Sequence, residues 1–354
     1  MAQSDQSGDN VFERIRQDEG AKAPVLVGWA MDQALLDRIA AFDPRIRLLN
    51  RDIPPLPPPD ELWPPFPDRL TPLVPHAEIL LTLRLPAGVP ESTPQLRWIH
   101  SQSAGIDYPA RAPGLLDANV IITTSSGVHA QPLAETVVGA IIALAKGFPQ
   151  AVRRQILREW TRYTPGDVAG ALVGVIGAGK IGTAVAERCR GMGMRAWGIR
   201  RDPGALDPSE PRSPFERLLG PDGLPELLAA SDYIVLCAPR TPETLRMLGP
   251  EEFSMVKPGA CFINVARGDL VVEDALIAAL SSGRLGGAYL DVFESEPLPP
   301  DSPLWDMPNV LMTAHSGAGS ADRDTRVVDL FLENLRRYLD GLPLLNVYDH
   351  GRGY

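Results

Sequence analysis

Three side chains near the end of the sequence have types suited to acid–base chemistry on a small organic acid. Arg267 lies in the motif NVARG, Glu296 in FESEP and His315 in MTAHSG. An arginine can bind a carboxylate and a carbonyl through paired hydrogen bonds. A histidine can donate or accept a proton near neutral pH, and a carboxylate can stabilise its charged form. The set would serve the reduction of a 2-keto acid, provided that a hydride donor binds nearby.

A glycine-rich turn, GVIGAGKIG over residues 174–182, is the expected binding site for that donor. A strand predicted over Leu172–Ile176 precedes the turn and a predicted helix follows it. Gly177 permits the tight turn, Gly179 lets the backbone approach a pyrophosphate, and Gly182 lets helix and strand pack closely. This strand–turn–helix context indicates a dinucleotide site more strongly than the glycines alone.

Two arginines, Arg200 and Arg201, follow the next predicted strand. An acid at this position would accept hydrogen bonds from the ribose 2′-hydroxyl of NAD, whereas guanidinium groups would bind the 2′-phosphate of NADP. NADP is therefore the expected cofactor, with NAD possible if Asp202 binds the ribose and both arginines are solvated. Arg240 either adds positive charge near the adenosine end or faces solvent.

Short apolar strands alternate with helical segments along most of the chain, which favours an α/β fold with parallel sheets. Strands are predicted at 24–27, 77–82, 96–100 and 120–123, and then at 172–176, 195–199, 233–237, 261–264, 287–292 and 310–313. Helices are predicted at 32–42, 133–146, 149–160 and 321–339. The proline-rich stretch 53–75 is expected to be an ordered surface loop, or less favourably a recognition tract for a proline-binding partner.

The charge and composition of the chain disfavour several classes of function. The chain has 354 residues and a formal net charge of −10, which disfavours nucleic acid and anionic membrane surfaces as partners. The N-terminus has no apolar core typical of a signal peptide, and the longest apolar stretch, 136–145, is too short to cross a bilayer. The three cysteines lack CxxC spacing, so we expect buried free thiols, no metal site and a cytoplasmic location.

The motifs together resemble the D-isomer-specific 2-hydroxyacid dehydrogenase family, glyoxylate/hydroxypyruvate reductases in particular. The resemblance covers about 25–347 and rests on SAGID (103–107), GVIGAGKIG, APRTPET (238–244), NVARGDLV, LDVFESEP and the His315 segment. It implies two Rossmann-like, doubly wound parallel-sheet domains with a cleft between them, the cofactor domain being inserted in the substrate domain. The expected boundaries are a disordered tail over 1–22, a substrate domain over 23–127 and 318–354, and an NAD(P)-binding domain over 128–317. A homodimer is also implied.

The resemblance assigns roles to individual residues. Arg267 would bind substrate, His315 would be the general acid/base and Glu296 would support it. Ala104 and Gly105 would offer backbone N–H groups to the substrate carboxylate, unless they form an ordinary turn. Arg84 would contact a second anionic group or point to water. The residues expected to bind cofactor are Gly177, Ala178, Gly179, Lys180, Ile181, Arg200, Arg201, Pro239, Arg240, Ala266, Asp291, His315 and Gly317.

Other assignments also carry alternatives. Taken singly, Arg267 could form a surface ion pair, Glu296 could be a helix-start acid and His315 a packed core histidine. Asp291 resembles the family residue that meets the nicotinamide carboxamide, but it could simply end a strand. Arg240 stands where the family usually has leucine, which supports a phosphate contact and leaves the details of cofactor binding open.

The leading hypothesis is therefore NADPH-preferring reduction of glyoxylate, hydroxypyruvate or a similar small 2-keto acid to the D-2-hydroxy acid. One alternative is NAD-dependent oxidation of a 2-hydroxy acid. Another, of a different class, is a dinucleotide-sensing protein that acts through partners, as related corepressors do. Oxidation of formate or phosphite is disfavoured, because formate enzymes of this type pair the histidine with an amide and not with an acid such as Glu296.

Overall fold

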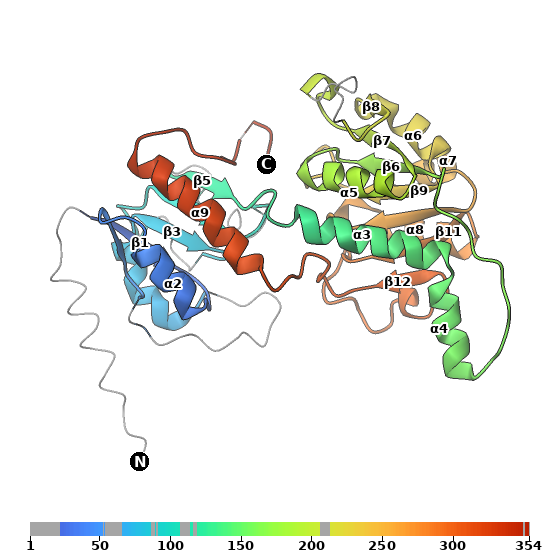
Figure 1. The fold of residues 1–354 in the computed structure, drawn as a ribbon, viewed down its shortest axis with the longest axis horizontal. Helices are drawn as coiled ribbons and strands as arrows, with labels where there is room; N and C mark the ends of the chain where they lie inside the picture. The colour runs from blue at the N-terminus through green and yellow to red at the C-terminus, as the bar shows by residue number, and fades with distance from the viewer. Residues whose placement is uncertain are drawn as a thin grey trace, which may run out of the picture. The chain divides into compact units, whose positions relative to one another are not determined.

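The computed structural model describes residues 22–51, 53, 66–85, 89, 91–106, 114–115, 119–205, 213–349 and 351–353. These residues form two compact units (Figure 1). Unit 1 contains the described residues up to Val128 and from Ala321 onward, and unit 2 is His129–Ser320. Unit 2 is thus inserted in the sequence of unit 1. The predicted tail (except Lys22), much of the proline-rich stretch and Asp107 of the SAGID motif lie outside the described residues.

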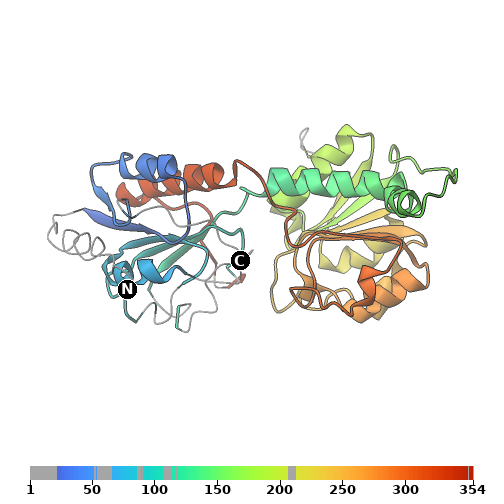
Figure 2. The same cartoon turned by 90° about the horizontal axis from the view of Figure 1, so that it is seen from below.

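Unit 1 is built on a five-stranded, fully parallel sheet with strand order β2-β1-β3-β4-β5. The helices α2 and α9 cover one face of this sheet, and the 3₁₀ helix η1 covers the other (Figure 2). The bounds are β1 Ala23–Val27, α2 Gln33–Ala40, β2 Ile46–Leu48, η1 Asp68–His76, β3 Ile79–Thr82, β4 Trp98–Ser101, β5 Ile121–Thr124 and α9 Arg323–Leu339.

Alternate strand residues explain this layering, because successive side chains of a strand point to opposite faces. Val25 and Val27 pack with the helices, whereas Leu26 packs with η1. η1 corrects the prediction of a proline-rich loop over 53–75. Its leucines at 70 and 73 are each 1% exposed, so burial of apolar side chains stabilises a helical turn despite Pro72 and Pro75.

Unit 2 is built on a seven-stranded, fully parallel sheet with strand order β12-β11-β10-β9-β6-β7-β8. Its strands are β6 Leu172–Ile176, β7 Arg195–Ile199, β8 Arg217–Leu219, β9 Tyr233–Leu236, β10 Ala260–Asn264, β11 Leu285–Leu290 and β12 Val310–Met312. Its helices are α3 Ala130–Ala145, α4 Phe148–Leu157, α5 Lys180–Gly191, α6 Leu224–Ala230, α7 Pro250–Met255 and α8 Glu273–Ser281, with short 3₁₀ turns η3 Pro203–Ala205, η4 Pro221–Gly223, η5 Gly268–Leu270 and η6 Pro303–Trp305.

Both faces of this sheet are covered, which is why its strands are near-continuous apolar runs in the sequence. Val173 and Val175 pack with α3 and α5, and Leu236 packs with α6, α7 and α8 on the other face. The predicted α/β fold with two parallel-sheet domains is confirmed. Two short strands, β2 and β8, were not predicted, and β8 is only half-buried along its three residues.

The two helices that open unit 2 differ in their surroundings. Helix α3 packs against α5 and β10, whereas α4 exposes most of its apolar side chains. Among the described residues no single helix has both the length and the apolarity to cross a membrane; α3 and α4 reach that length only as a pair, which is bent by 62°.

Candidate functional site

The carboxyl edge of the seven-stranded sheet holds the His315–Glu296 pair. The imidazole Nδ1 of His315 lies 2.8 Å from Oε2 of Glu296, and the two side chains are 17% and 29% exposed. The other carboxylate oxygen, Oε1, accepts a hydrogen bond from the backbone N–H of Phe293 at 3.1 Å. The carboxylate is therefore fixed at both oxygens, and it holds the His315 ring at Nδ1.

Asp291 holds the turn that presents His315. The side chain of Asp291 is 2% exposed, and its Oδ1 accepts hydrogen bonds from Thr313 Oγ1 at 2.5 Å and from the N–H groups of Ser316 and Gly317 at 2.9 Å. The His315 N–H donates to the Asp291 carbonyl at 2.8 Å. His315 has φ +47°, a left-handed conformation that is uncommon for a residue with a Cβ. These hydrogen bonds oppose relaxation of that backbone.

Arg267 follows β10 and opens the turn η5. Asn264 at the strand end fixes this turn, because its amide donates to the Arg267 carbonyl at 3.1 Å and its Oδ1 accepts from Ala266 N–H at 3.0 Å. A Cβ on Gly268 would lie 1.9 Å from the carbonyl carbon of Phe293. Only glycine fits there, and this close approach brings the Arg267 turn against the segment that carries Glu296.

The electrostatics of Glu296 connect all three side chains. Burial by itself would raise the pKa of this carboxyl group. The hydrogen bond and charge of His315, the Phe293 N–H and the positive charge of Arg267 outweigh burial and leave the pKa below its usual value. Arg267 is thus within Coulomb range of the pair. The structure brings the three residues singled out by type and order together on one edge of one unit.

The glycine turn after β6 has the geometry of a dinucleotide cradle. Gly177 has φ +101°, and a Cβ there would lie 2.5 Å from the Ala238 nitrogen, so neither the backbone nor the space accepts a side chain. A Cβ on Gly182 would lie 2.4 Å from the Gly177 carbonyl oxygen. At Gly179 a Cβ would meet nothing within 4 Å, which leaves the start of α5 open to a pyrophosphate. Ala178, Lys180 and Ile181 lie in the same turn and first helical residues.

The three arginines proposed for the cofactor have different environments. Arg200, directly after β7, is half-buried, and no ion pair to its guanidinium occurs within the described residues. The Arg201 guanidinium lies 3.6 Å from Glu243. Arg240 Nε lies 2.5 Å from Asp269 Oδ2, while the Pro239 carbonyl accepts from Thr244 at 2.7 Å. Among the three, only Arg201 and Arg240 are therefore paired with an acid of the described residues.

The residues predicted for substrate contacts belong to unit 1. Ala104 and Gly105 lie in the turn after β4, where Gly105 N–H lies 3.3 Å from Ser103 Oγ and the Gly105 carbonyl lies 3.4 Å from Ser101 Oγ. Arg84 lies two residues after β3, and its carbonyl accepts from Thr82 Oγ1 at 2.6 Å. All three therefore follow the carboxyl ends of parallel strands, the edge at which open α/β sheets bind ligands.

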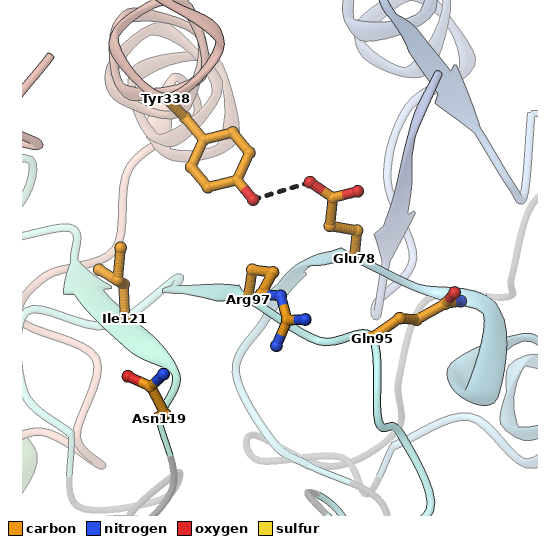
Figure 3. A pocket seen from close by; sticks show the side chains of 6 residues that line it. All are labelled: Glu78, Gln95, Arg97, Asn119, Ile121 and Tyr338. Atoms are coloured by element: carbon orange, nitrogen blue, oxygen red, sulfur yellow. Dashed lines mark hydrogen bonds between the residues drawn. The ribbon is translucent and has the colours of Figure 1, made fainter. Parts of the chain in front are cut away.

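A cavity of about 520 Å³ lies at the opposite edge of the sheet of unit 1 (Figure 3). Its lining includes Arg97 and Glu78, which precede β4 and β3, and Tyr338 of α9, whose hydroxyl donates to Glu78 at 2.7 Å. A second cavity, of about 370 Å³, lies where β9 and β10 begin. Both cavities lie at the amino ends of strands, so neither contains the residues that the chemistry needs.

His100, in β4 of unit 1, is a core histidine and does not belong to the candidate site. It is fully buried, and burial lowers its pKa to about 3. Its ring nitrogens pair with Thr123 Oγ1 at 2.7 Å and Ser125 Oγ at 3.2 Å. It is a neutral core residue. No cluster of potential metal ligands occurs among the described residues.

Two supporting residues were not singled out from the sequence. Asn264 shapes the Arg267 turn, and Thr313 links the Asp291 carboxylate to the Tyr289 hydroxyl, which is 2.6 Å from Thr313 Oγ1. Only their positions in the sequence could have indicated them. Asn264 ends β10 shortly before Arg267, and Thr313 follows β12 shortly before His315.

Known proteins resemble this chain over most of its length. The model of the NAD-binding domain of D-isomer specific 2-hydroxyacid dehydrogenases matches residues 138–317. A glyoxylate reductase from Korarchaeum cryptofilum is 33% identical over 273 residues, which cover 74% of this chain and 79% of that protein.

Solved structures match a larger share of this chain than the glyoxylate reductase from Korarchaeum cryptofilum does. A D-isomer specific 2-hydroxyacid dehydrogenase from Xanthobacter autotrophicus, in complex with NADPH and MES, has a TM-score of 0.77 and 31% identity, and the match covers 94% of this chain and all of that one. An NADPH-dependent glyoxylate/hydroxypyruvate reductase from Sinorhizobium meliloti, in complex with NADP and sulfate, has a TM-score of 0.75 and 25% identity with the same coverage. The chain belongs to the D-isomer-specific 2-hydroxyacid dehydrogenase family and is an NAD(P)-dependent oxidoreductase that acts on CH–OH groups.

Proposed function

We propose that this dehydrogenase reduces glyoxylate, hydroxypyruvate or a similarly small 2-keto acid to the D-2-hydroxy acid, with NADPH preferred over NADH. The observation that carries this proposal is the 2.8 Å contact between His315 and Glu296 with Arg267 in Coulomb range. The names of the relatives from Korarchaeum cryptofilum and Sinorhizobium meliloti support the choice of substrates.

Arg267 would bind the substrate carboxylate with its planar guanidinium and polarise the adjacent carbonyl. His315, as an imidazolium with Nδ1 held by Glu296, would donate the Nε2 proton to the carbonyl oxygen. Bound nicotinamide would supply the hydride to the carbonyl carbon. The carbonyl thus gains one hydride and one proton and becomes the hydroxyl group, and His315 recovers its proton from solvent. In the oxidative direction neutral His315 would accept the hydroxyl proton.

A kinetic panel tests the proposed function. We expect the purified protein to oxidise NADPH, followed as loss of nicotinamide absorbance, with glyoxylate or hydroxypyruvate and to give the D isomer from hydroxypyruvate. Absence of turnover with a broad set of 2-keto acids and both nicotinamides would instead favour a dinucleotide-sensing protein.

The preference for NADPH rests on Arg200 and Arg201 at the end of β7. A guanidinium there forms charge-assisted bonds to a 2′-phosphate, whereas NADH offers only hydroxyl groups. Arg200 is the stronger candidate because Arg201 lies near Glu243. The complexes of the Xanthobacter and Sinorhizobium proteins with NADPH and NADP support the same preference.

Replacing Arg200 with aspartate should reverse the preference. The carboxylate would repel the 2′-phosphate and accept hydrogen bonds from the ribose, so the ratio of kcat/KM for NADPH to that for NADH should fall about 10- to 100-fold. Arg195→Asp, at the far end of β7, is the matched control and should leave the ratio unchanged. An unchanged ratio in the Arg200 variant would remove Arg200 from cofactor selection.

The backbone N–H groups of Ala104 and Gly105 and the Arg84 guanidinium are the groups of unit 1 that we propose for substrate binding. Under this assignment unit 1 is the substrate domain and unit 2 the nicotinamide domain. The turn at Ala104 and Gly105 would then bind the substrate carboxylate, and the turn at Gly177 and Gly179 would bind the cofactor pyrophosphate, since each offers backbone N–H groups to an anion.

We also propose that the protein is a homodimer that uses α4 as its interface. Phe148, Val152 and Ile156 recur every four residues on one helical face and are 51%, 54% and 75% exposed. Leu157 at the end of the helix and Trp160, three residues further on, are 65% and 96% exposed. Exposed apolar side chains gathered on one helical face are typical of a protein–protein interface.

Ile156→Glu should convert the dimer to a monomer. A charge placed in a buried apolar interface loses hydration without gaining a partner, which costs several kcal/mol, about 2–5. Light scattering coupled to size exclusion should report half the mass of the unmodified protein. Leu342→Glu, a 47% exposed leucine of unit 1, is the control and should leave the mass unchanged. A monomer in the unmodified protein, or a dimer in both variants, would exclude this interface.

A further inference from the structure

An ion pair joins the loop after β9 to the turn that Arg267 opens. Arg240 Nε lies 2.5 Å from Oδ2 of Asp269, and the two side chains are 45% and 32% exposed. The second oxygen, Oδ1 of Asp269, is buried and has no hydrogen-bond partner among the described residues. Because Oδ1 has lost its hydrogen bonds to water, the charge of this carboxylate is stabilised by Arg240 more than the charge of an ordinary surface acid would be.

Asp269 belongs to η5, the turn that Arg267 opens. The loop after β9 also binds the backbone of this turn. The Asp269 carbonyl accepts a hydrogen bond from Arg246 N–H at 2.9 Å, and the Leu270 carbonyl accepts one from Leu248 N–H at 3.2 Å. The residues from Arg240 to Leu248 therefore contact the turn through side chain and backbone. A movement of this loop would move the backbone next to Arg267.

The contacts continue to the segment that carries Glu296. Arg246 Nη1 lies 2.7 Å from Glu294 Oε1, and the Glu294 N–H donates to Glu273 Oε2 at 3.2 Å. Gly268 packs directly on the backbone of Phe293 and Glu294. One connected set of contacts thus joins the loop after β9, the Arg267 turn and the start of the FESEP segment.

We infer that Arg240 is a positioning residue for Arg267, acting through Asp269, and not a contact for the cofactor phosphate. The inference rests on the proposed role of Arg267 as the substrate-binding arginine. A guanidinium that binds a carboxylate in two places must be held in a narrow range of positions, and the Arg240–Asp269 pair restrains the turn from which it projects. Leucine at this position would leave the Asp269 carboxylate without this partner.

The test is the kinetics of Arg240→Leu, Asp269→Asn and the double variant. Because the ion pair is partly exposed, Arg240→Leu should raise the KM for the 2-keto acid only modestly, by about 1.4-fold to fivefold. The rise should be the same with NADPH and NADH, because the affected group is the substrate arginine. Adding Asp269→Asn to Arg240→Leu should cause no further loss, since the two residues act as one unit. Arg240→Lys, which keeps the charge, should recover part of the affinity.

A phosphate contact would give a different pattern. In that case Arg240→Leu would raise the KM for NADPH alone, Asp269→Asn would have little effect, and the positioning role would be wrong. The positioning role would also be wrong if Arg240→Leu and the unmodified protein had the same KM for the 2-keto acid, for NADPH and for NADH. Arg195→Leu, which breaks the exposed pair with Glu216 at the amino end of β7, is the matched control and should change none of them.

Calorimetric binding of oxalate, a dicarboxylate that resembles a 2-keto acid, separates this inference from the proposed function. Oxalate bound by the unmodified protein and more weakly by Arg240→Leu would support the positioning role even if no 2-keto acid were turned over, an outcome that would reject only the proposed function. Equal binding by both proteins would reject the positioning role. Absence of oxalate binding to the unmodified protein would reject both.

Discussion

His315→Ala should lower kcat for reduction by about 10²- to 10⁴-fold while changing the KM for the 2-keto acid little. The methyl group cannot donate a proton, so water would have to protonate the developing alkoxide. Substrate binding should persist because Asn264 holds the Arg267 carbonyl and the Arg267 guanidinium donates to the Ala266 carbonyl. The measurement is steady-state reduction with saturating NADPH.

The control for this substitution is His76→Ala, which removes a histidine from η1 of unit 1. It should leave both kinetic parameters near those of the unmodified protein. A His315→Ala variant that kept more than about a tenth of the unmodified kcat could not be reconciled with a general acid at this position.

Arg267→Ala is expected to affect binding and rate together, with kcat/KM lower by about 10²- to 10⁴-fold. Hydrogen bonds to a charged group contribute roughly 1.5–3 kcal/mol each, and a bidentate carboxylate contact contains two of them. Loss of the guanidinium also removes the positive charge that helps to lower the pKa of Glu296.

Arg267→Lys separates charge from geometry. Lysine retains a positive charge but not the planar fork, so its kcat/KM should lie between those of the alanine variant and the unmodified protein. If lysine restored full activity, bidentate recognition would not be needed. If alanine itself retained normal kcat/KM, Arg267 would not be the residue that binds substrate.

The grouping of Arg267, Glu296 and His315 could be predicted from the sequence because it depends on residue types in a fixed order. Arg267, Glu296 and His315 each follow or lie near a predicted strand, and parallel strands bring their carboxyl ends to one edge. The glycine turn was predictable for a similar reason, since only glycine accepts φ +101° at Gly177 in contact with the Ala238 backbone.

What could not be predicted depends on side-chain pairing between segments distant in sequence. Nothing in the local sequence of Arg240 indicates Asp269, which lies 29 residues further on. Similarly, Asp291 was assigned to the cofactor or to a strand end, and its hydrogen bonds to the His315 turn appear only in three dimensions. The short strands β2 and β8 were missed because three residues give too little periodicity for a pattern to detect.

The most direct test of the account is kcat for reduction, measured at saturating NADPH and 2-keto acid in the unmodified protein and in Glu296→Gln. The Glu296 carboxylate lies 2.8 Å from His315 Nδ1 and holds the ring that is proposed to donate the proton. Glutamine keeps the size and a hydrogen-bonding group but not the charge, so kcat should fall about 10- to 100-fold while the KM for the 2-keto acid changes little. Equal kcat values for the two proteins would contradict proton donation by a Glu296-supported His315.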